Sequence, residues 1–298
     1  MSQQFIGFVQ TLFVPACLML IMFSMGLTLA VRDFGLVLRG GRLVLAGLGG
    51  QLLLLPVLGL AVALAFPLSP ELALGVFIIS ICPAGTTSNA LTFVGRGNVA
   101  LAVVLTAISS LVTVFSIPFL LSWAIPFFLG RGGDVPVLPI PQTIAQLFVI
   151  TVVPVGLGMV VHRYWSEAAA RLVRWLRPMA LVLMIAVIAF SVAISLDMVL
   201  AQLVGAGPAM WTLNVLATLA GLLIGRAIGA GRRDSMTIAI EIGVQNASLA
   251  IFLTLTVLGS LPLAVTQNIY GIVMLLNGFI LIRLFRARLR AEEAAVPA

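Results

Sequence analysis

The segment Cys82-Pro-Ala-Gly-Thr-Thr-Ser-Asn89 places a run of polar side chains inside a hydrophobic stretch that is long enough to cross a bilayer. A second interruption, Glu241-Ile-Gly-Val-Gln-Asn-Ala-Ser248, lies in a similar stretch near the C-terminus. Non-helical backbone at membrane depth is tolerated only where it is buried in protein or lines a watery cavity. Two such interruptions at corresponding places in two halves of a chain are typical of a transporter's binding site.

The composition predicts that nearly the whole chain lies in a membrane. Of its 298 residues, 62% are hydrophobic and 8% are charged, and the mean hydropathy is +1.24. Apolar spans of about 20 residues are typical of membrane helices, and such spans use up almost the full length. The formal net charge of +7 does not indicate nucleic-acid binding, because the basic residues lie between the spans and form no polybasic patch.

The hydrophobic pattern predicts an all-α membrane protein with nine transmembrane helices in one polytopic domain, residues 1–298. The third helix is expected to break near residues 83–88, and the eighth near residues 243–247. The first segment lacks a basic leader and a small-residue cleavage site, so we expect it to be a retained helix. The predicted helices cover residues 5–31, 41–66, 71–95, 98–128, 138–162, 178–196, 207–228, 235–258 and 263–285.

The distribution of arginines predicts the orientation of these helices. All sixteen basic residues are arginines, and an external N-terminus puts fifteen of them on the inner side and Arg131 alone on the outer side. Positive residues are enriched in cytoplasmic loops, so we expect a cytoplasmic C-terminus and a cell (inner) membrane location. The inner set is Arg32, Arg39, Arg42, Arg96, Arg163, Arg171, Arg174, Arg177, Arg226, Arg232, Arg233, Arg283, Arg286, Arg288 and Arg290, and the acidic residues Glu71, Asp134 and Asp197 fall outside.

The two broken helices also predict an internal repeat. They are the third and the eighth, so their separation is odd in helix number, and an odd offset reverses the orientation of the second copy. The repeats are therefore expected to be inverted. Repeats of five helices would give ten, and the helix that is missing from the predicted nine would precede the first.

Glu241 is the only acidic residue deep inside an apolar span. A charged side chain at mid-bilayer costs about 2.5–3.5 kcal/mol on insertion scales, so such a residue normally has a partner. The chain contains no lysine, and no arginine lies near the middle of a predicted helix. We therefore expect Glu241 to be protonated or neutralised by a bound cation. The alternative is a protonated glutamic acid that is hydrogen-bonded to a neighbouring helix.

The first interruption supplies neutral oxygens that suit a sodium ion. Pro83 lacks a backbone N–H and disrupts the preceding turn, and Gly85 lets the chain open. Thr86, Thr87, Ser88 and Asn89 then offer hydroxyl and amide oxygens. The half-helix that starts near these residues directs the positive end of its dipole at the gap, which favours an anionic group there. The alternative interpretation is a simple Pro-Gly kink in a packed helix.

At these residues the chain resembles the bile acid:sodium symporter family. The matching strings are Met22-Phe-Ser-Met-Gly-Leu-Thr-Leu29, Cys82-Pro-Ala-Gly-Thr-Thr-Ser-Asn89, Arg96-Gly-Asn-Val-Ala-Leu101 and Glu241-Ile-Gly-Val-Gln-Asn246. The resemblance implies symport of an organic anion (a bile acid, pantoate or a keto acid) with sodium by alternating access. It implies two broken helices that cross in a core domain, helices within 41–128 and 207–285, beside a panel of helices 5–31, 138–162 and 178–196.

The resemblance also implies the site residues and two sodium ions. The first sodium site would use Ser88, Asn89, Thr106 and Glu241, and Ala102 stands where the family often has a further hydroxyl. The second would use the side chains of Gln51, Glu241 and Gln245 with the backbone carbonyls of Ile242 and Val244. The substrate contacts would come from Thr86, Thr87 and Asn246.

Other functions remain open at this point. A related efflux carrier could use Cys82 as a soft metalloid ligand, and a proton-coupled carrier could cycle a proton on Glu241. A membrane sensor that binds an anion without moving it is a third alternative. An enzyme is not expected, because no nucleophile–base pair or aspartate pair lies at membrane depth and no phosphate-binding loop occurs. The expected partners are the anion and the lipid bilayer, with no obligate protein partner.

Overall fold

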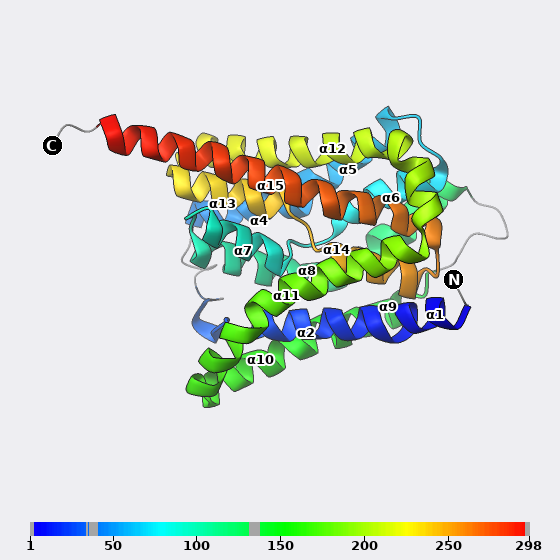
Figure 1. Ribbon diagram of the computed structural model, residues 1–298, viewed down its shortest axis with the longest axis horizontal. Helices are drawn as coiled ribbons and strands as arrows, with labels where there is room; N and C mark the ends of the chain where they lie inside the picture. Colours follow the sequence, from blue (N-terminus) through cyan, green and yellow to red (C-terminus); the bar gives the residue numbers. More distant parts are fainter. Residues whose placement is uncertain (1–2, 34, 36–40, 131–137, 296–298) are drawn as a thin grey trace.

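The computed structural model describes residues 3–33, 35, 41–130 and 138–295 and is helical throughout apart from turns and one isolated bridge. Figure 1 shows long helices running roughly antiparallel, with the two termini at opposite ends of the bundle. This confirms the all-α fold. The helices are α1 Gln3–Phe8, η1 Val9–Phe13, α2 Val14–Gly26, α4 Gly41–Gly49, η2 Gly50–Leu54, α5 Leu55–Ala65, α6 Pro70–Ile81, α7 Thr86–Val94, α8 Val99–Leu129, α9 Ile140–Leu147, η3 Phe148–Val152, α10 Val153–Tyr164, α11 Ser166–Ile194, α12 Leu196–Ala227, α13 Arg232–Gly243, α14 Ala247–Phe252, η4 Leu253–Val257 and α15 Leu261–Ala295.

Six helical segments of the described chain are long and apolar enough to cross a membrane, which makes this a multi-pass membrane protein. A bent pair, Ser166–Leu176 and Pro178–Ile194, would be a seventh. The helices Pro70–Ile81 and Ala247–Val257 are apolar but shorter, because each ends at or begins from a break. The count of nine crossings stays a prediction, since it requires the bent pair and both broken helices to cross as single units.

Three of the four π-helical turns precede a proline. The turns η1, η2 and η3 each end two residues before one, namely Pro15, Pro56 and Pro154. A proline lacks the backbone N–H, and its ring crowds the carbonyl four residues earlier. The wider π turn moves that carbonyl aside without ending the helix. Gln51, one of the residues expected at the second cation site, lies in η2 and is buried there, with 4% of its surface exposed.

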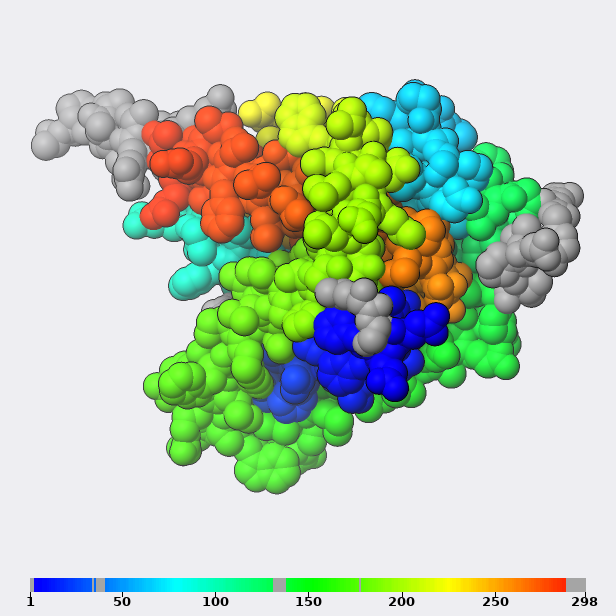
Figure 2. All heavy atoms as spheres, turned by 45° about the vertical axis from the view of Figure 1, so that its right-hand side comes forward, coloured from blue at the N-terminus to red at the C-terminus, as the bar shows by residue number. Residues whose placement is uncertain are grey.

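The helices fall into two groups. In the first, α2 packs against α10 and α11, and in the second α12 packs against α13 and α15 while α6 packs against α5 and α15. Figure 1 shows α1, α2, α10 and α11 on one side of the bundle and α12, α13 and α15 on the other. In Figure 2 the blue N-terminal helix and the green α10 and α11 form the lower body, and the red end of α15 lies in the upper body.

The structure corrects several predicted boundaries. Residues 163–177, expected as a loop, are largely helical, because α11 starts at Ser166 and bends by 42° near Pro178. The helix α12 begins at Leu196, eleven residues before the predicted start at residue 207. Similarly, α15 continues to Ala295 through a segment expected to be a tail. The added turns of α11 carry exposed charged residues such as Arg171 and Arg174, which leave the hydrophobic window but remain compatible with a helix.

The described arginines gather at one end of the bundle. They lie where α2, α7, α10 and α12 end, where α4, α11 and α13 begin, and in the C-terminal half of α15. This is the end that the predicted orientation assigns to the cytoplasm. Arg39, Arg131 and Asp134 lie outside the described residues, as do the side chains of Arg177, Arg288 and Arg290.

Candidate functional site

The two interruptions meet in the interior of the protein. One separates α6 from α7 at residues 82–85, and the other separates α13 from α14 at residues 244–246. Ala84 and Gln245 form an antiparallel bridge, and the backbone N–H of Asn246 donates to the carbonyl of Pro83 at 2.9 Å. Backbone groups freed by one break are thus satisfied by the other, as burial in an apolar interior requires. The first break is shorter than predicted, because the helix resumes at Thr86.

Glu241 lies beside this crossing and is 1% exposed. Its Oε1 lies 2.5 Å from the hydroxyl oxygen of Ser88, and its Oε2 accepts from the Thr106 hydroxyl at 2.8 Å. The Thr106 hydroxyl is also 3.5 Å from the Oδ1 of Asn89. Three helices, α7, α8 and α13, therefore bring the four residues expected for the first cation site into one cluster, the Glu241 cluster.

The Glu241 cluster has fewer protons than its contacts require. The hydroxyl oxygen of Ser88 lies 2.7 Å from the carbonyl of Gly85 and also within hydrogen-bond distance of Glu241. Both are acceptors when the carboxyl group is ionised, and a serine has one hydroxyl proton to donate. The second contact is satisfied by a proton on Glu241 or by a cation among these oxygens. The structure thus retains the two states expected from the sequence.

The glutamines expected at the second cation site form a separate pair. The Nε2 of Gln51 donates to the Oε1 of Gln245 at 2.8 Å and to the carbonyl of Cys82 at 2.9 Å. The Nε2 of Gln245 donates to the carbonyl of Ile242 at 2.6 Å. The carbonyl of Ile242 is thus already engaged, while the hydrogen bonds of Glu241 go to Ser88 and Thr106 and not to the pair. In this conformation the Oε1 of Gln245 and the carbonyl of Ile242 both accept hydrogen bonds, with which a cation would have to compete.

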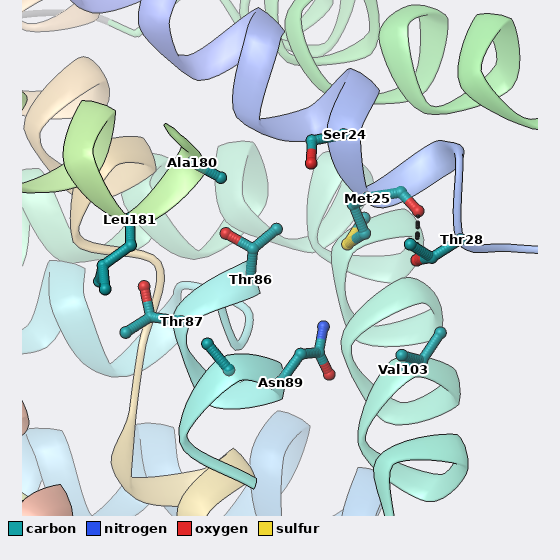
Figure 3. A pocket seen from close by; sticks show the side chains of 10 residues that line it. Ser24, Met25, Thr28, Thr86, Thr87, Asn89, Val103, Ala180 and Leu181 are labelled. Atoms are coloured by element: carbon teal, nitrogen blue, oxygen red, sulfur yellow. Dashed lines mark hydrogen bonds between the residues drawn. The ribbon is translucent and has the colours of Figure 1, made fainter. Parts of the chain in front are cut away.

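A cavity lies beside α7 (Figure 3). Its volume is about 30 Å³, which is room for about two water molecules at about 10–15 Å³ each. Four helices contribute to it: α2 and α11 belong to the first group, while α7 packs against α13 of the second group and α8 packs against α13 and α6 of that group. The lining residues are Ser24, Met25, Thr28, Thr86, Thr87, Asn89, Ala90, Val103, Ala180 and Leu181.

The expected substrate residues are only partly brought together. Thr86 and Thr87 line the cavity, and the Thr87 hydroxyl donates to the sulfur of Met184 on α11 at 2.7 Å. Asn246 does not line it and instead caps α14, where its Oδ1 accepts from the backbone N–H of Leu249 at 3.0 Å. Asn246 therefore lies outside this cavity in this conformation, and its contact with a substrate stays a prediction.

Sequence reasoning missed several residues that shape the site. Ser24 and Thr28 of α2 line the cavity, and the Met184 sulfur accepts a hydrogen bond at its edge. Asn214 and Tyr270 both donate to the carbonyl of Gly243, at 2.7 Å and 2.9 Å, and so hold the end of α13. The available signal was a polar side chain within an apolar span, which marks a candidate but does not say what it faces.

The donor atoms near Glu241 suit a hard cation. They are one carboxylate, two hydroxyl groups and one carboxamide oxygen, and oxygen ligands of this kind are typical of hard cations. Within the described ranges no group of three or more His, Cys, Asp or Glu side chains could hold a metal ion. Cys82 is buried and unpaired, as is Cys17, so a soft site would depend on one thiol.

Comparisons with known proteins point in one direction. The model of the Sodium Bile acid symporter family matches residues 15–202. A probable sodium/metabolite cotransporter of rice chloroplasts, BASS2, is 30% identical over 90% of this chain and 62% of its own length. The uncharacterized sodium-dependent transporter YocS of Bacillus subtilis is 28% identical over 92% of this chain and 83% of its own. The human ileal sodium/bile acid cotransporter is 29% identical over 78% of this chain and 66% of its own length.

Proposed function

The chain belongs to the sodium bile acid symporter family, and we propose that it carries an organic anion across the membrane together with sodium. The expectation of this family is confirmed, and the relatives described above are transporters and not enzymes. The matched region spans 62% of the rice relative, less than two thirds of its length. The substrate and the coupling therefore rest on the geometry of this chain's own site.

The Glu241 cluster is the observation that carries the proposal. A buried carboxylate needs a compensating positive charge, and the groups around it are hydroxyl and carboxamide oxygens. We assign one sodium ion to this cluster and a second to the Gln51–Gln245 pair. The first ion ties α7 and α8 to α13, and the second ties η2 to α13 and the break that follows it.

The cavity beside α7 is the proposed anion site. It offers hydroxyl and amide groups, and no basic side chain is among the residues that line it. The positive charge for the anion therefore comes from the N-terminal end of α7 and from sodium in the adjacent cluster. A pantoate-like or keto-acid-like anion is larger than about two waters. Its binding accordingly requires α2 and α11 to move away from α7 and α8.

This movement gives the proposed transport mechanism. The first group of helices serves as a panel (residues 5–31, 138–162 and 178–196) and the second as a core (41–128 and 207–285), related through inverted repeats across nine membrane crossings. At the N-terminal end the groups are joined by hydrogen bonds from Thr256 to the Gln10 carbonyl at 2.6 Å and from Asn268 to Ser195 at 3.3 Å. Alternating access breaks these bonds. We place the protein in the inner membrane with this end outside.

Uptake by purified protein in liposomes tests the function. Radiolabelled pantoate, pyruvate and taurocholate are offered with an inward sodium gradient, with an inward proton gradient, or with neither. The proposal predicts uptake of at least one anion that depends on sodium. Uptake driven by protons alone would instead support a proton-coupled carrier, and binding without uptake would support a sensor.

Ala102→Ser is expected to leave sodium affinity unchanged or to tighten it. Ala102 is fully buried, one turn before Thr106 on α8, so a serine there adds one hydroxyl near the cation. The measurement is the sodium concentration that gives half of the maximal thermal stabilisation of the purified protein. Ala107→Ser, also buried on α8, is the matched control. A large loss of affinity in the Ala102 variant alone would show that the cation lies elsewhere.

Met184→Leu is expected to lower the apparent KM for the anion by about 2- to 10-fold. The substitution conserves volume but removes the sulfur that accepts from Thr87, which frees this hydroxyl for the anion. The range corresponds to a net hydrogen-bond contribution of about 0.5–1.5 kcal/mol. Met179→Leu, an exposed position on the same helix, is the control. An unchanged or higher KM would mean that the Thr87–Met184 contact does not compete with substrate.

A further inference from the structure

Asn89 belongs to both halves of the proposed site. Its Oδ1 lies 3.5 Å from the Thr106 hydroxyl and so faces the Glu241 cluster. The same residue lines the cavity beside α7. Figure 3 shows its amide nitrogen directed into the cavity and its oxygen turned toward α8. One planar group therefore presents an acceptor to the cation cluster and a donor to the anion cavity.

The donor side of this group has no partner among the residues that the structure describes. Asn89 is 7% exposed, and its Nδ2 forms no hydrogen bond within the described ranges. Across the cavity Ser24 of α2 is 6% exposed, and its hydroxyl likewise has no hydrogen-bond partner among the described residues. Figure 3 shows this hydroxyl pointing into the same space. Both donors face the cavity and are open to it, and donors that converge on one space favour a ligand that accepts hydrogen bonds.

We propose that Asn89 couples the two substrates, with its Oδ1 binding sodium and its Nδ2 binding a carboxylate whose shell is completed by the Ser24 hydroxyl. The inference rests on the proposed function, and it names the residues that link sodium binding to anion binding. A cation on Oδ1 polarises the carboxamide and makes its N–H groups stronger donors. Sodium therefore increases anion affinity through Asn89, and by reciprocity the anion increases sodium affinity.

The arrangement also specifies the substrate class. Nδ2 and the Ser24 hydroxyl come from the two opposite groups of helices, so an acceptor with two oxygens can bridge them. A carboxylate provides this bridge and links α2 to α7 when it binds. The apolar lining by Met25, Val103 and Leu181 suits the carbon chain next to that carboxylate. The inferred substrate is therefore a small carboxylate with a short apolar body.

Asn89→Asp separates the two roles, because it keeps an oxygen toward the cluster and replaces the donor with an acceptor. The purified full-length protein is titrated by thermal shift with sodium alone, and then with pantoate, pyruvate or taurocholate at saturating sodium. The variant is expected to keep half-maximal stabilisation by sodium within about threefold of the unsubstituted protein, or lower. The further stabilisation by the anion is expected to be lost, with at least about a tenfold loss in anion affinity.

Ser24→Ala is the second variant, and Ser191→Ala, a buried serine outside the cavity, is its control. Ser24→Ala is expected to weaken the anion about 3- to 10-fold, consistent with one hydrogen bond, and to leave the sodium response unchanged. Loss of the sodium response in Asn89→Asp, or full anion binding in either variant, would overturn the inference. An unsubstituted protein that ignores sodium, or that binds none of the three anions, overturns the proposed function itself. Sodium-dependent uptake of an anion that both variants still bind normally overturns the inference alone.

Discussion

Glu241→Gln is expected to reduce sodium-dependent uptake at least about 100-fold while the protein still folds. The substitution keeps the size of the side chain and its contacts with Ser88 and Thr106, but it removes the negative charge that holds the cation. Separating a buried ion from its partner costs about 3–5 kcal/mol, which corresponds to two or more orders of magnitude in affinity. Uptake into liposomes at saturating anion and varied sodium measures the effect.

The fold of this variant is expected to survive because the glutamine is neutral. A buried carboxylate must be compensated, whereas a carboxamide can donate to the Ser88 oxygen and accept from Thr106. The thermal midpoint without sodium should therefore stay equal or rise, and its increase on adding sodium should vanish. Glu71→Gln, an exposed acid in the first turn of α6, is the control. Sodium-dependent uptake that persists in Glu241→Gln would refute the cation assignment.

The sequence predicts the fold class and both breaks because those features depend on hydrophobic length and on proline. Ile81 and Gly243 end their half-helices within a few residues of the predicted breaks. The sequence could not place the start of α11, because amphipathic and charged turns extend this helix beyond its apolar window. The residues of α11 before its bend illustrate this, since Trp175 is 77% exposed yet helical. Residues 196–206 at the start of α12 are mostly apolar, and the sequence does not show that they belong to this helix and not to the connection before it.

For the site, the first cation cluster was predictable and the cavity was not. The burial of Glu241 in an apolar span already requires a partner, the family resemblance adds Ser88 and Thr106, and the structure brings the three together. The cavity depends on which side chains of α2 and α11 face α7, and sequence alone does not determine that rotation. The same limit explains Asn246, whose amide oxygen serves as a helix cap, a role that any Asn at a helix start can take.

A close contact between glycines of α2 and α10 could not be predicted from the sequence either. Disrupting it is the second substitution with a large expected effect. Gly26 lies in the string Met22–Leu29 that carries the family resemblance, and nothing in the sequence explains its presence. In the structure a β-carbon on Gly26 would lie 2.2 Å from the carbonyl oxygen of Val155, and one on Gly158 would lie 2.5 Å from that of Phe23. The two helices therefore touch backbone to backbone, as small residues permit in membrane interfaces.

Gly158→Val is accordingly expected to prevent stable folding, lowering the thermal midpoint by more than about 10 °C or abolishing monodisperse protein. Overpacking a filled core costs about 1–3 kcal/mol, and the obstacle here is backbone, which cannot rotate away as a side chain does.

Gly156→Ala on the same helix is the matched control. A β-carbon there meets no atom within 4 Å, and alanine favours a helix over glycine by about 1 kcal/mol, so this variant should be as stable or more stable. Equal midpoints for the two variants would mean that α2 and α10 do not pack at these glycines. Because α2 also carries Ser24 into the cavity, a partly folded Gly158 variant should lose anion binding while the Glu241 cluster, built from α7, α8 and α13, still responds to sodium.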